Sequence, residues 1–180
     1  MHRLFIGLRP PPHIRAQLMG AMGGIGGARW QDDEQLHLTV RYAGEVDGRL
    51  ADDIAAALGQ IHAPPIAVSL HGVGRFERQG RTDTLWAGVT PHDALAALHR
   101  KVDHALVHIG LAPEGRAYLP HITLARLPRA LGAEVEVAAF LARQAGLASA
   151  AFSFDHLVLF ESELTRDGAR YHAVERWRLG

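Results

Sequence analysis

The sequence of 180 residues contains no cysteine and only one lysine, Lys101. Without cysteine the chain can form no disulfide framework and no iron–sulfur cluster, and it offers no thiolate nucleophile or thiolate zinc site. The remaining eighteen basic residues are arginines, and nineteen acidic residues bring the formal net charge to zero. Because a broad positive field is missing, we do not expect binding along duplex DNA, and any nucleic acid must be met at a local site.

Long hydrophobic runs are also missing. The apolar stretch at residues 4–8 is too short for the core of a signal peptide, and the uncharged, glycine-rich stretch 16–28 is too short to cross a bilayer. The composition, 48% hydrophobic and 21% charged, nevertheless supplies a folded core. We therefore expect a single domain over residues 1–180, cytoplasmic, with no membrane partner and no obligate protein partner.

Hydrophobic periodicity predicts strands and helices in alternation. Proline, glycine and Asp-Gly signals separate the apolar runs. The expected strands cover residues 3–9, 36–43, 66–76, 84–89, 119–127, 151–160 and 169–179. The expected helices cover residues 12–22, 50–61, 93–109 and 135–147.

The order of these elements repeats along the chain. His37 precedes Val68 of the following strand by 31 residues, and His121 precedes Phe152 of the corresponding strand by the same number. This spacing predicts a duplicated unit. We expect a first repeat of about residues 1–80, a second of about 81–165 and then the terminal strand, with the two histidine strands facing one another about an approximate two-fold axis.

The triplet His-x-Thr occurs twice, at His37 with Thr39 and at His121 with Thr123, each followed by an apolar residue. On a strand, residues two apart project to the same face, so each motif presents an imidazole beside a hydroxyl. One such motif alone is typical of surface residues on a half-exposed strand. The matched pair favours a site in which two imidazoles flank one small anion and two hydroxyls donate to its oxygens.

That arrangement suits the cleavage of a phosphodiester. A neutral imidazole can take a proton from water while a protonated one gives a proton to the departing oxygen, and the usual histidine pKa of about 6.5 allows both forms near neutrality. No metal and no cofactor is needed for this chemistry. Three alternatives stay open: a metallophosphoesterase using the surplus histidines, a nucleotide-binding module without turnover, and an interaction scaffold. The pair His104 and His108 has helical metal-ligand spacing but lacks the glutamate of a zinc-protease motif.

The sequence resembles the 2H phosphoesterase superfamily, and within it the RNA 2′,3′-cyclic phosphodiesterases, also called 2′-5′ RNA ligases. The resemblance covers essentially the whole chain. It is carried by RLFIGL at the start, RW at 29–30, LHLTVRYAGEV at 36–46, LWAGV at 85–89, PHITLAR at 120–126 and FESEL at 160–164.

The resemblance implies a bilobal α+β fold, with two mainly antiparallel sheets lining a central cleft and helices on the outside. It implies hydrolysis of the 2′,3′-cyclic phosphate of RNA ends or small nucleotides to a 2′-phosphate. In that family the first histidine is the proton donor and the second the acceptor, which assigns His37 and His121 to these roles; the pseudo-symmetry leaves the order reversible. The same path run backwards would join RNA by a 2′-5′ bond.

Two arginines follow the motifs and are candidates to bind the substrate phosphate. In an ideal strand Arg41 shares the face of His37, whereas Arg126 lies opposite to His121. Arg126 therefore reaches the site only if the strand ends or contains a bulge near Ala125.

Aromatic residues near the motifs are candidates for stacking on a base. They are Tyr42, Phe5, Tyr118 and Tyr171. A place in the core is the alternative for each of them.

Overall fold

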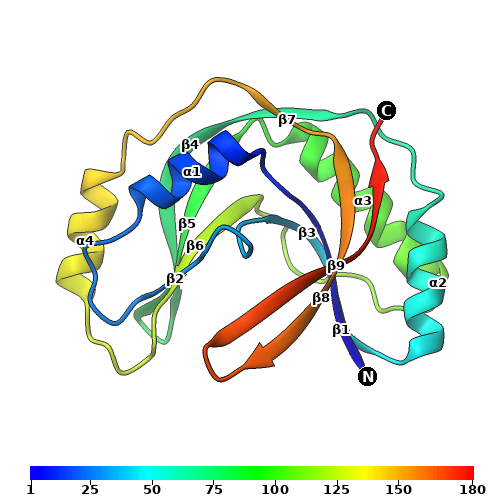
Figure 1. Cartoon of the computed structure of the whole chain (residues 1–180), viewed down its shortest axis with the longest axis horizontal. Coiled ribbons are helices and arrows are strands. Elements are labelled where there is room, and N and C mark those ends of the chain that lie inside the picture. Colours follow the sequence, from blue (N-terminus) through cyan, green and yellow to red (C-terminus); the bar gives the residue numbers. More distant parts are fainter.

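The computed structural model describes all residues from 1 to 180 and contains four helices and nine strands (Figure 1). The helices are α1 (Pro12–Ala21), α2 (Gly48–Leu58), α3 (Asp93–His108) and α4 (Glu134–Arg143). The strands are β1 (His2–Leu8), β2 (Arg29–Trp30), β3 (Leu38–Val46), β4 (Ile66–Arg78), β5 (Arg81–Thr90), β6 (His121–Arg126), β7 (Phe152–Phe154), β8 (His156–Thr165) and β9 (Gly168–Arg178).

The order of elements predicted from periodicity is confirmed, with two differences. Arg29–Trp30, expected in a loop, form the short strand β2. The single strand expected over 151–160 is two strands, β7 and β8, separated at Asp155. β7 pairs with β4, whereas β8 pairs with β1 and β9. The chain therefore passes at Asp155 from one half of the sheet to the other, which the continuous apolar pattern does not reveal.

The strands form one antiparallel sheet in the order β7-β4-β5-β6-β3-β1-β8-β9, with β2 added beside β6. β3 and β6, which carry the two motifs, are joined by a single residue pair, Leu38 with Ile122. The two expected sheets thus exist as two halves of one hydrogen-bonded path that meet at a narrow junction. Outward from that junction, β6-β5-β4-β7 corresponds strand for strand to β3-β1-β8-β9.

The halves exchange strands between the two repeats. β4 comes from the first half of the chain but pairs with β5, and β8 comes from the second half but pairs with β1. Figure 1 shows α1 and α4 at one flank, α2 and α3 at the other, and the β8–β9 hairpin between them. Each half is therefore built from both repeats, so neither can complete its sheet alone.

The main core lies between the sheet and its helices. α3 contributes four fully covered apolar residues at helical spacing, Leu95, Leu98, Val102 and Leu106. Leu38 and Ile122 of the junction are buried in the same core. Because alternate residues of a strand project to opposite faces, the histidines and threonines that flank these two residues project away from the core.

None of the four helices combines the length and the hydrophobicity that a bilayer crossing requires.

Candidate active site

The ring of His37 is held by two hydrogen bonds. Its Nδ1 lies 2.7 Å from the carbonyl oxygen of Gln35, and its Nε2 lies 3.0 Å from Thr39 Oγ1. Since a carbonyl oxygen can only accept, Nδ1 carries hydrogen and donates to Gln35. In the neutral ring, Nε2 is then the basic atom and accepts from the Thr39 hydroxyl, and it is the atom that can exchange a proton.

The second motif repeats this anchoring. His121 Nδ1 lies 2.7 Å from the carbonyl oxygen of Leu119, again two residues earlier in the chain. The same argument leaves Nε2 of His121 as the atom that can gain or lose a proton. Both imidazoles are thus fixed in the same tautomer by their own backbone.

The junction brings the four motif side chains together. Because Leu38 is paired with Ile122 in an antiparallel ladder, His37 stands across from Thr123, and Thr39 stands across from His121. The two imidazoles therefore occupy one diagonal of a four-residue cluster and the two hydroxyls the other. In an ideal ladder such diagonal neighbours lie about 7–8 Å apart, and somewhat less between their Cβ atoms, which leaves room for one phosphate between the rings.

Aromatic rings enclose His37 on one side of the cluster. The His37 ring lies 4.7 Å from Phe5, 5.1 Å from Tyr171 and 5.8 Å from Phe160, measured between ring centroids. Phe5 and Phe160 belong to a small apolar cluster separate from the main core, against which Tyr171 packs. This cluster supports the cleft floor beneath the imidazole.

His121 has fewer aromatic neighbours than His37. Its ring lies 4.9 Å from Phe76, which meets it edge-on, and 6.0 Å from Trp86. Trp86 stands directly across from Thr123 in the β5–β6 ladder. The side chains of His121, Thr123, Trp86 and Phe76 therefore lie on the same face of the sheet. His121 is therefore less enclosed than His37.

The electrostatics of the cleft favour neutral imidazoles. The pKa of His37 is lowered to about 4, mainly by burial and also by the positive charges of Arg126, His121 and Arg9, against the opposing effect of the hydrogen bond to the Gln35 carbonyl. The pKa of His121 is lowered by burial and by Arg126. Without a ligand both rings are neutral at neutral pH. A bound anion opposes these effects and favours the protonated form of one ring.

A β-bulge follows the histidine and threonine in each motif strand. Between Thr123 and Ala125 the register against β5 shifts by one residue at Leu124, so Ala125 is buried and Arg126 turns to the cleft face. Arg126 lines the same cavity as His37. The bulge on which the placement of Arg126 depends is therefore present.

The equivalent bulge in β3 has the opposite effect on the first arginine. The register against β1 shifts at Val40, so Arg41 turns away from the face of His37. Its guanidinium is buried, pairs with Asp103 on α3 at 2.7 Å and donates to the carbonyl oxygens of Tyr42 and Ala112. The expectation that Arg41 binds the phosphate assumes an ideal strand. Arg41 does line the smaller cavity with Thr39 and His121, but its guanidinium is engaged by Asp103 and two carbonyl oxygens, and we do not assign it to the phosphate.

Arg41 instead connects the two motifs. Asp103 also accepts from the backbone of Glu114, and the loop that contains Ala112 and Glu114 leads to His121. Although burial raises the pKa of Asp103, the hydrogen bonds from Arg41 and Glu114 hold it below its usual value. The strand of the first histidine is in this way tied to the loop that positions the second.

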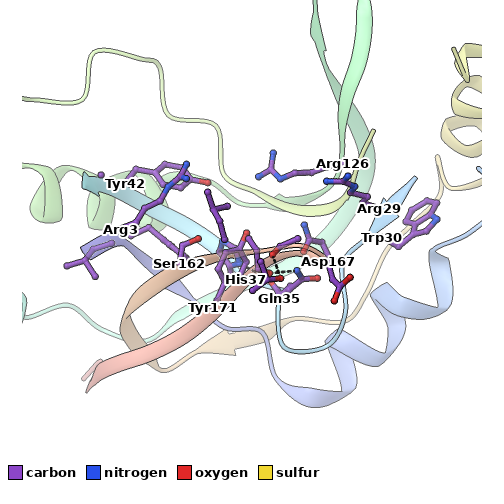
Figure 2. Close-up of a pocket in the computed structure, with 18 of the residues that line it drawn as sticks. Arg3, Arg29, Trp30, Gln35, His37, Tyr42, Arg126, Ser162, Asp167 and Tyr171 are labelled. Atoms are coloured by element: carbon purple, nitrogen blue, oxygen red, sulfur yellow. Dashed lines mark hydrogen bonds between the residues drawn. The ribbon is translucent and has the colours of Figure 1, made fainter. Parts of the chain in front are cut away.

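Two cavities lie beside the motif residues, and each contains one of the two imidazoles. The larger, about 730 Å³, is lined by His37, Phe5, Tyr171 and Arg126 among others (Figure 2), and falls within the range typical of ligand sites. The smaller, about 330 Å³, is lined by His121, Thr39 and Tyr118 among others. Tyr42 and Arg116 line both.

The four candidate stacking residues have different environments. Tyr42 is 47% exposed and its ring is accessible from the cleft. Phe5 is almost fully buried against His37, and Tyr171 meets that ring edge-on. Tyr118 stacks on His99 and donates its hydroxyl to the carbonyl oxygen of Thr39, so it supports the first motif strand. Tyr42 is the ring best placed to meet a base.

Sequence reasoning assigned no role to several polar residues that line the larger cavity. These are Arg3, Arg29, Gln31 and Gln35. The Arg-Trp pair at 29–30 was the only available signal, because the others come from segments far from the motifs in sequence. No three histidine, aspartate or glutamate side chains converge as metal ligands, and His104 and His108 lie exposed on α3.

Two imidazoles and two hydroxyls on adjacent antiparallel strands form the arrangement that the resemblance to the 2H phosphoesterases implies. The chain belongs to the 2′-5′ RNA ligase superfamily, whose family model matches residues 10–166.

A relative agrees with this membership, and a solved structure shares the fold. The chain is 32% identical over 145 residues to an RNA 2′,3′-cyclic phosphodiesterase of Aeropyrum pernix, covering 79% of this chain and 81% of the relative. It is 24% identical to an enzyme of the same name from Methanocaldococcus jannaschii, over 97% of this chain and 99% of that one. The fold matches the crystal structure of Escherichia coli LigT complexed with 3′-AMP, with a TM-score of 0.78, 23% identity and coverage of 99% and 98%.

Proposed function

We propose that the protein hydrolyses the 2′,3′-cyclic phosphate of RNA ends or small nucleotides to a 2′-phosphomonoester. The observation that carries this proposal is the diagonal cluster at the β3–β6 junction, where each imidazole is anchored through Nδ1 and keeps Nε2 for proton exchange. The names of the relatives support the same reaction.

Two proton transfers accompany the reaction. Nε2 of neutral His121 takes a proton from water, and the water oxygen forms a bond to phosphorus. The bond from phosphorus to O3′ breaks, and protonated His37 gives its Nε2 proton to O3′. Because the pKa of His37 is low, its protonated form is a strong acid, and the bound phosphate supplies the negative charge that populates this form.

The other cleft residues act on charge and orientation. The hydroxyls of Thr39 and Thr123 donate to the nonbridging phosphate oxygens, and Arg126 neutralises the charge that develops on them. Tyr42 offers an exposed ring to the base of the substrate.

Ligation follows at the same site when another nucleophile takes the place of water. If a 5′-hydroxyl replaces water as the nucleophile and O2′ keeps its bond to phosphorus, the product is a 2′-5′ phosphodiester. The proton transfers are unchanged, since His121 deprotonates the hydroxyl and His37 protonates O3′.

The test is hydrolysis of 2′,3′-cyclic AMP with EDTA present. We expect full activity, because both proton transfers are made by imidazoles and need no metal. His37→Ala and His121→Ala should each lower kcat by about 10² to 10⁴, whereas His104→Ala on the outer surface of α3 should leave it unchanged.

Three results would contradict this proposal. Loss of activity in EDTA that added metal restores indicates a metallophosphoesterase. Saturable nucleotide binding without product indicates a binding module. Formation of the 3′-phosphate in place of the 2′-phosphate means that O2′ is the leaving atom and that the substrate lies in the opposite orientation.

A further inference from the structure

Positive charge is concentrated in the larger cavity although the chain as a whole is neutral. Four arginines line it, Arg3, Arg29, Arg116 and Arg126, and Asp167 is the one acidic residue in its wall. Figure 2 shows Arg29 and Arg126 on one side of His37 and Arg3 with Tyr42 on the other. One cyclic phosphate carries a single negative charge, so the cavity holds more positive charge than the reacting group requires.

Arg29 and Arg126 form the densest part of this concentration. They stand directly across from each other in the β2–β6 ladder, so their side chains leave the sheet on the same face. Like charges at such positions destabilise a sheet. Neither guanidinium pairs with a carboxylate, whereas Arg15 and Arg41 elsewhere do. An anion bound between them removes this repulsion.

Gln31 provides a second, independent indication of a ligand. It follows Arg29 by two residues, it is 9% exposed, and it lines the same cavity. Its backbone NH donates to Leu124 at 2.8 Å, which fixes its position, yet its side-chain Oε1 has no hydrogen-bond partner. A buried acceptor without a donor is costly. Because Oε1 is itself covered from solvent, a ligand hydroxyl reaches it only when the Gln31 amide turns toward the cavity. A ribonucleotide, which carries a hydroxyl beside its anionic group, then satisfies both Gln31 and the arginines.

This site is displaced from the reacting phosphorus along β6. Arg126 follows His121 by five residues, one of which is taken up by the bulge at Leu124, so at ~3.3 Å per residue their Cα atoms lie roughly 13 Å apart. The long side chain of Arg126 spans part of this distance, since its charge acts on both imidazoles. Arg29 lies on β2, directly across from Arg126, and extends the positive surface of the cavity beyond Arg126.

We propose that Arg29 binds the phosphodiester next to the cyclic end, with Gln31 accepting a hydrogen bond from a ribose hydroxyl, so that RNA oligonucleotides are preferred to cyclic mononucleotides. This inference rests on the proposed function and names its substrate class. Arg126 stands between the two phosphates, and the positive surface from Arg126 to Arg29 gives the direction in which the chain leaves the site.

The experiment compares two substrates that differ by one phosphodiester: 2′,3′-cyclic AMP and the dinucleotide ApA with a 2′,3′-cyclic end. For the wild type we expect a kcat/KM at least about tenfold higher with the dinucleotide, since a charged hydrogen bond is added. Arg29→Gln should abolish this preference and leave the mononucleotide within about twofold. Arg49→Gln, an exposed arginine on α2, is the matched control and should change neither value.

Salt dependence gives a second readout that a structural defect does not reproduce. The slope of log kcat/KM against log salt should be steeper for the dinucleotide, and Arg29→Gln should reduce it by about 0.7, the value for one phosphate contact to a single strand. For the mononucleotide the slope should not change.

Several outcomes would overturn the assignment of Arg29. One is equal use of both substrates by the wild type. Another is an equal loss on both in Arg29→Gln. A third is weaker binding of ATP by that variant with unchanged dinucleotide kinetics, which would indicate a small polyphosphate nucleotide as the ligand.

The assignment can also be tested apart from turnover. If the wild type hydrolyses no cyclic phosphate, the proposed function fails. Binding of 2′-AMP and of ApA with a 2′-phosphate, measured by calorimetry, still tests Arg29, because only the dinucleotide should lose affinity in Arg29→Gln.

Discussion

The two motif strands have the same backbone path but carry different side chains along it. In both β3 and β6 the histidine donates from Nδ1 to the carbonyl two residues earlier, and a bulge follows at Val40 or Leu124. The bulge turns the fifth residue after each histidine into the cleft. That residue is Tyr42 in β3 and Arg126 in β6.

This comparison separates two requirements of the site. The shared backbone places two equivalent imidazoles, which suits a reaction with one proton transfer on each side of phosphorus. The differing side chains make the cleft unsymmetrical, since one half presents an aromatic ring and the other a positive charge. A duplicated fold can therefore supply symmetric proton transfer and still bind an unsymmetrical substrate in one orientation.

The largest effect is expected at the buried position after each bulge, where the two strands differ. This position holds Arg41 in β3 and Ala125 in β6. Arg41→Ala gives β3 the same residue that β6 carries at the equivalent position, but it leaves the Asp103 carboxylate without its counterion. We expect a loss of about 3 kcal/mol in the free energy of unfolding, measured in urea. Arg41→Met combined with Asp103→Leu should recover most of this loss.

The double variant also distinguishes two roles of Arg41: support of the loop before His121, and direct binding of the phosphate. If Arg41 acts only on the loop before His121, the repacked double variant should keep kcat within about threefold. Stable protein with a large loss of kcat would show that Arg41 contacts the phosphate after all.

The second contrast is that His37 is more completely enclosed than His121. This difference predicts how the stability of the protein depends on pH. His37 has a pKa of about 4 when folded and about 6.5 when unfolded, so the unfolded chain binds more protons between these values. Stability should fall by about 3 kcal/mol as the pH drops from about 6.5 to about 4. His37→Gln should remove this loss in urea unfolding across that range.

His121→Gln is the matched variant for that measurement. Its ring has two aromatic neighbours where His37 has three, so a smaller share of the pH dependence should disappear. An unchanged pH dependence in His37→Gln would mean that other groups cause it.

The charge difference between Arg126 and Tyr42 is the third contrast and has the smallest expected effect. Arg126 lowers the pKa of both imidazoles, so Arg126→Gln should raise both. The bell-shaped pH profile of kcat/KM should move to higher pH by up to about one unit, because the guanidinium is exposed and partly screened. Tyr42→Gln removes no charge and should leave the profile in place; a shift to lower pH in Arg126→Gln would contradict the electrostatic role.

Much of this molecule follows from sequence patterns of short range. The helices and strands follow from periodicity, and the shared face of His37 with Thr39 follows from alternation. The duplicated spacing predicts two motif strands facing one another about a two-fold axis; in the structure they are neighbours in one sheet, joined through Leu38 and Ile122. The split at Asp155 was not predictable, because two apolar strands that pair in different halves of the sheet look like one continuous run.

The flanking arginines show the limit of such reasoning most clearly. Arg41 was expected in the cleft and is buried against α3, while Arg126 reaches the cleft only through a bulge. A bulge is set by the register against the partner strand, β1 or β5, and these partners lie far away in sequence. The parity of a side chain beyond a bulge is thus a property of the sheet rather than of the strand.

By itself the sequence determined the chemistry available to this protein: two imidazoles, each beside a hydroxyl on the same strand face, and no thiolate. The tertiary structure decided how that chemistry is arranged. It placed the imidazoles on one diagonal through a single residue pair, lowered their pKa through burial and a nearby guanidinium, and gathered Arg3, Arg29 and Arg126 from three strands into one cavity. The reason is that alternation acts between adjacent residues, whereas register, burial and electric fields depend on neighbours that only folding brings together.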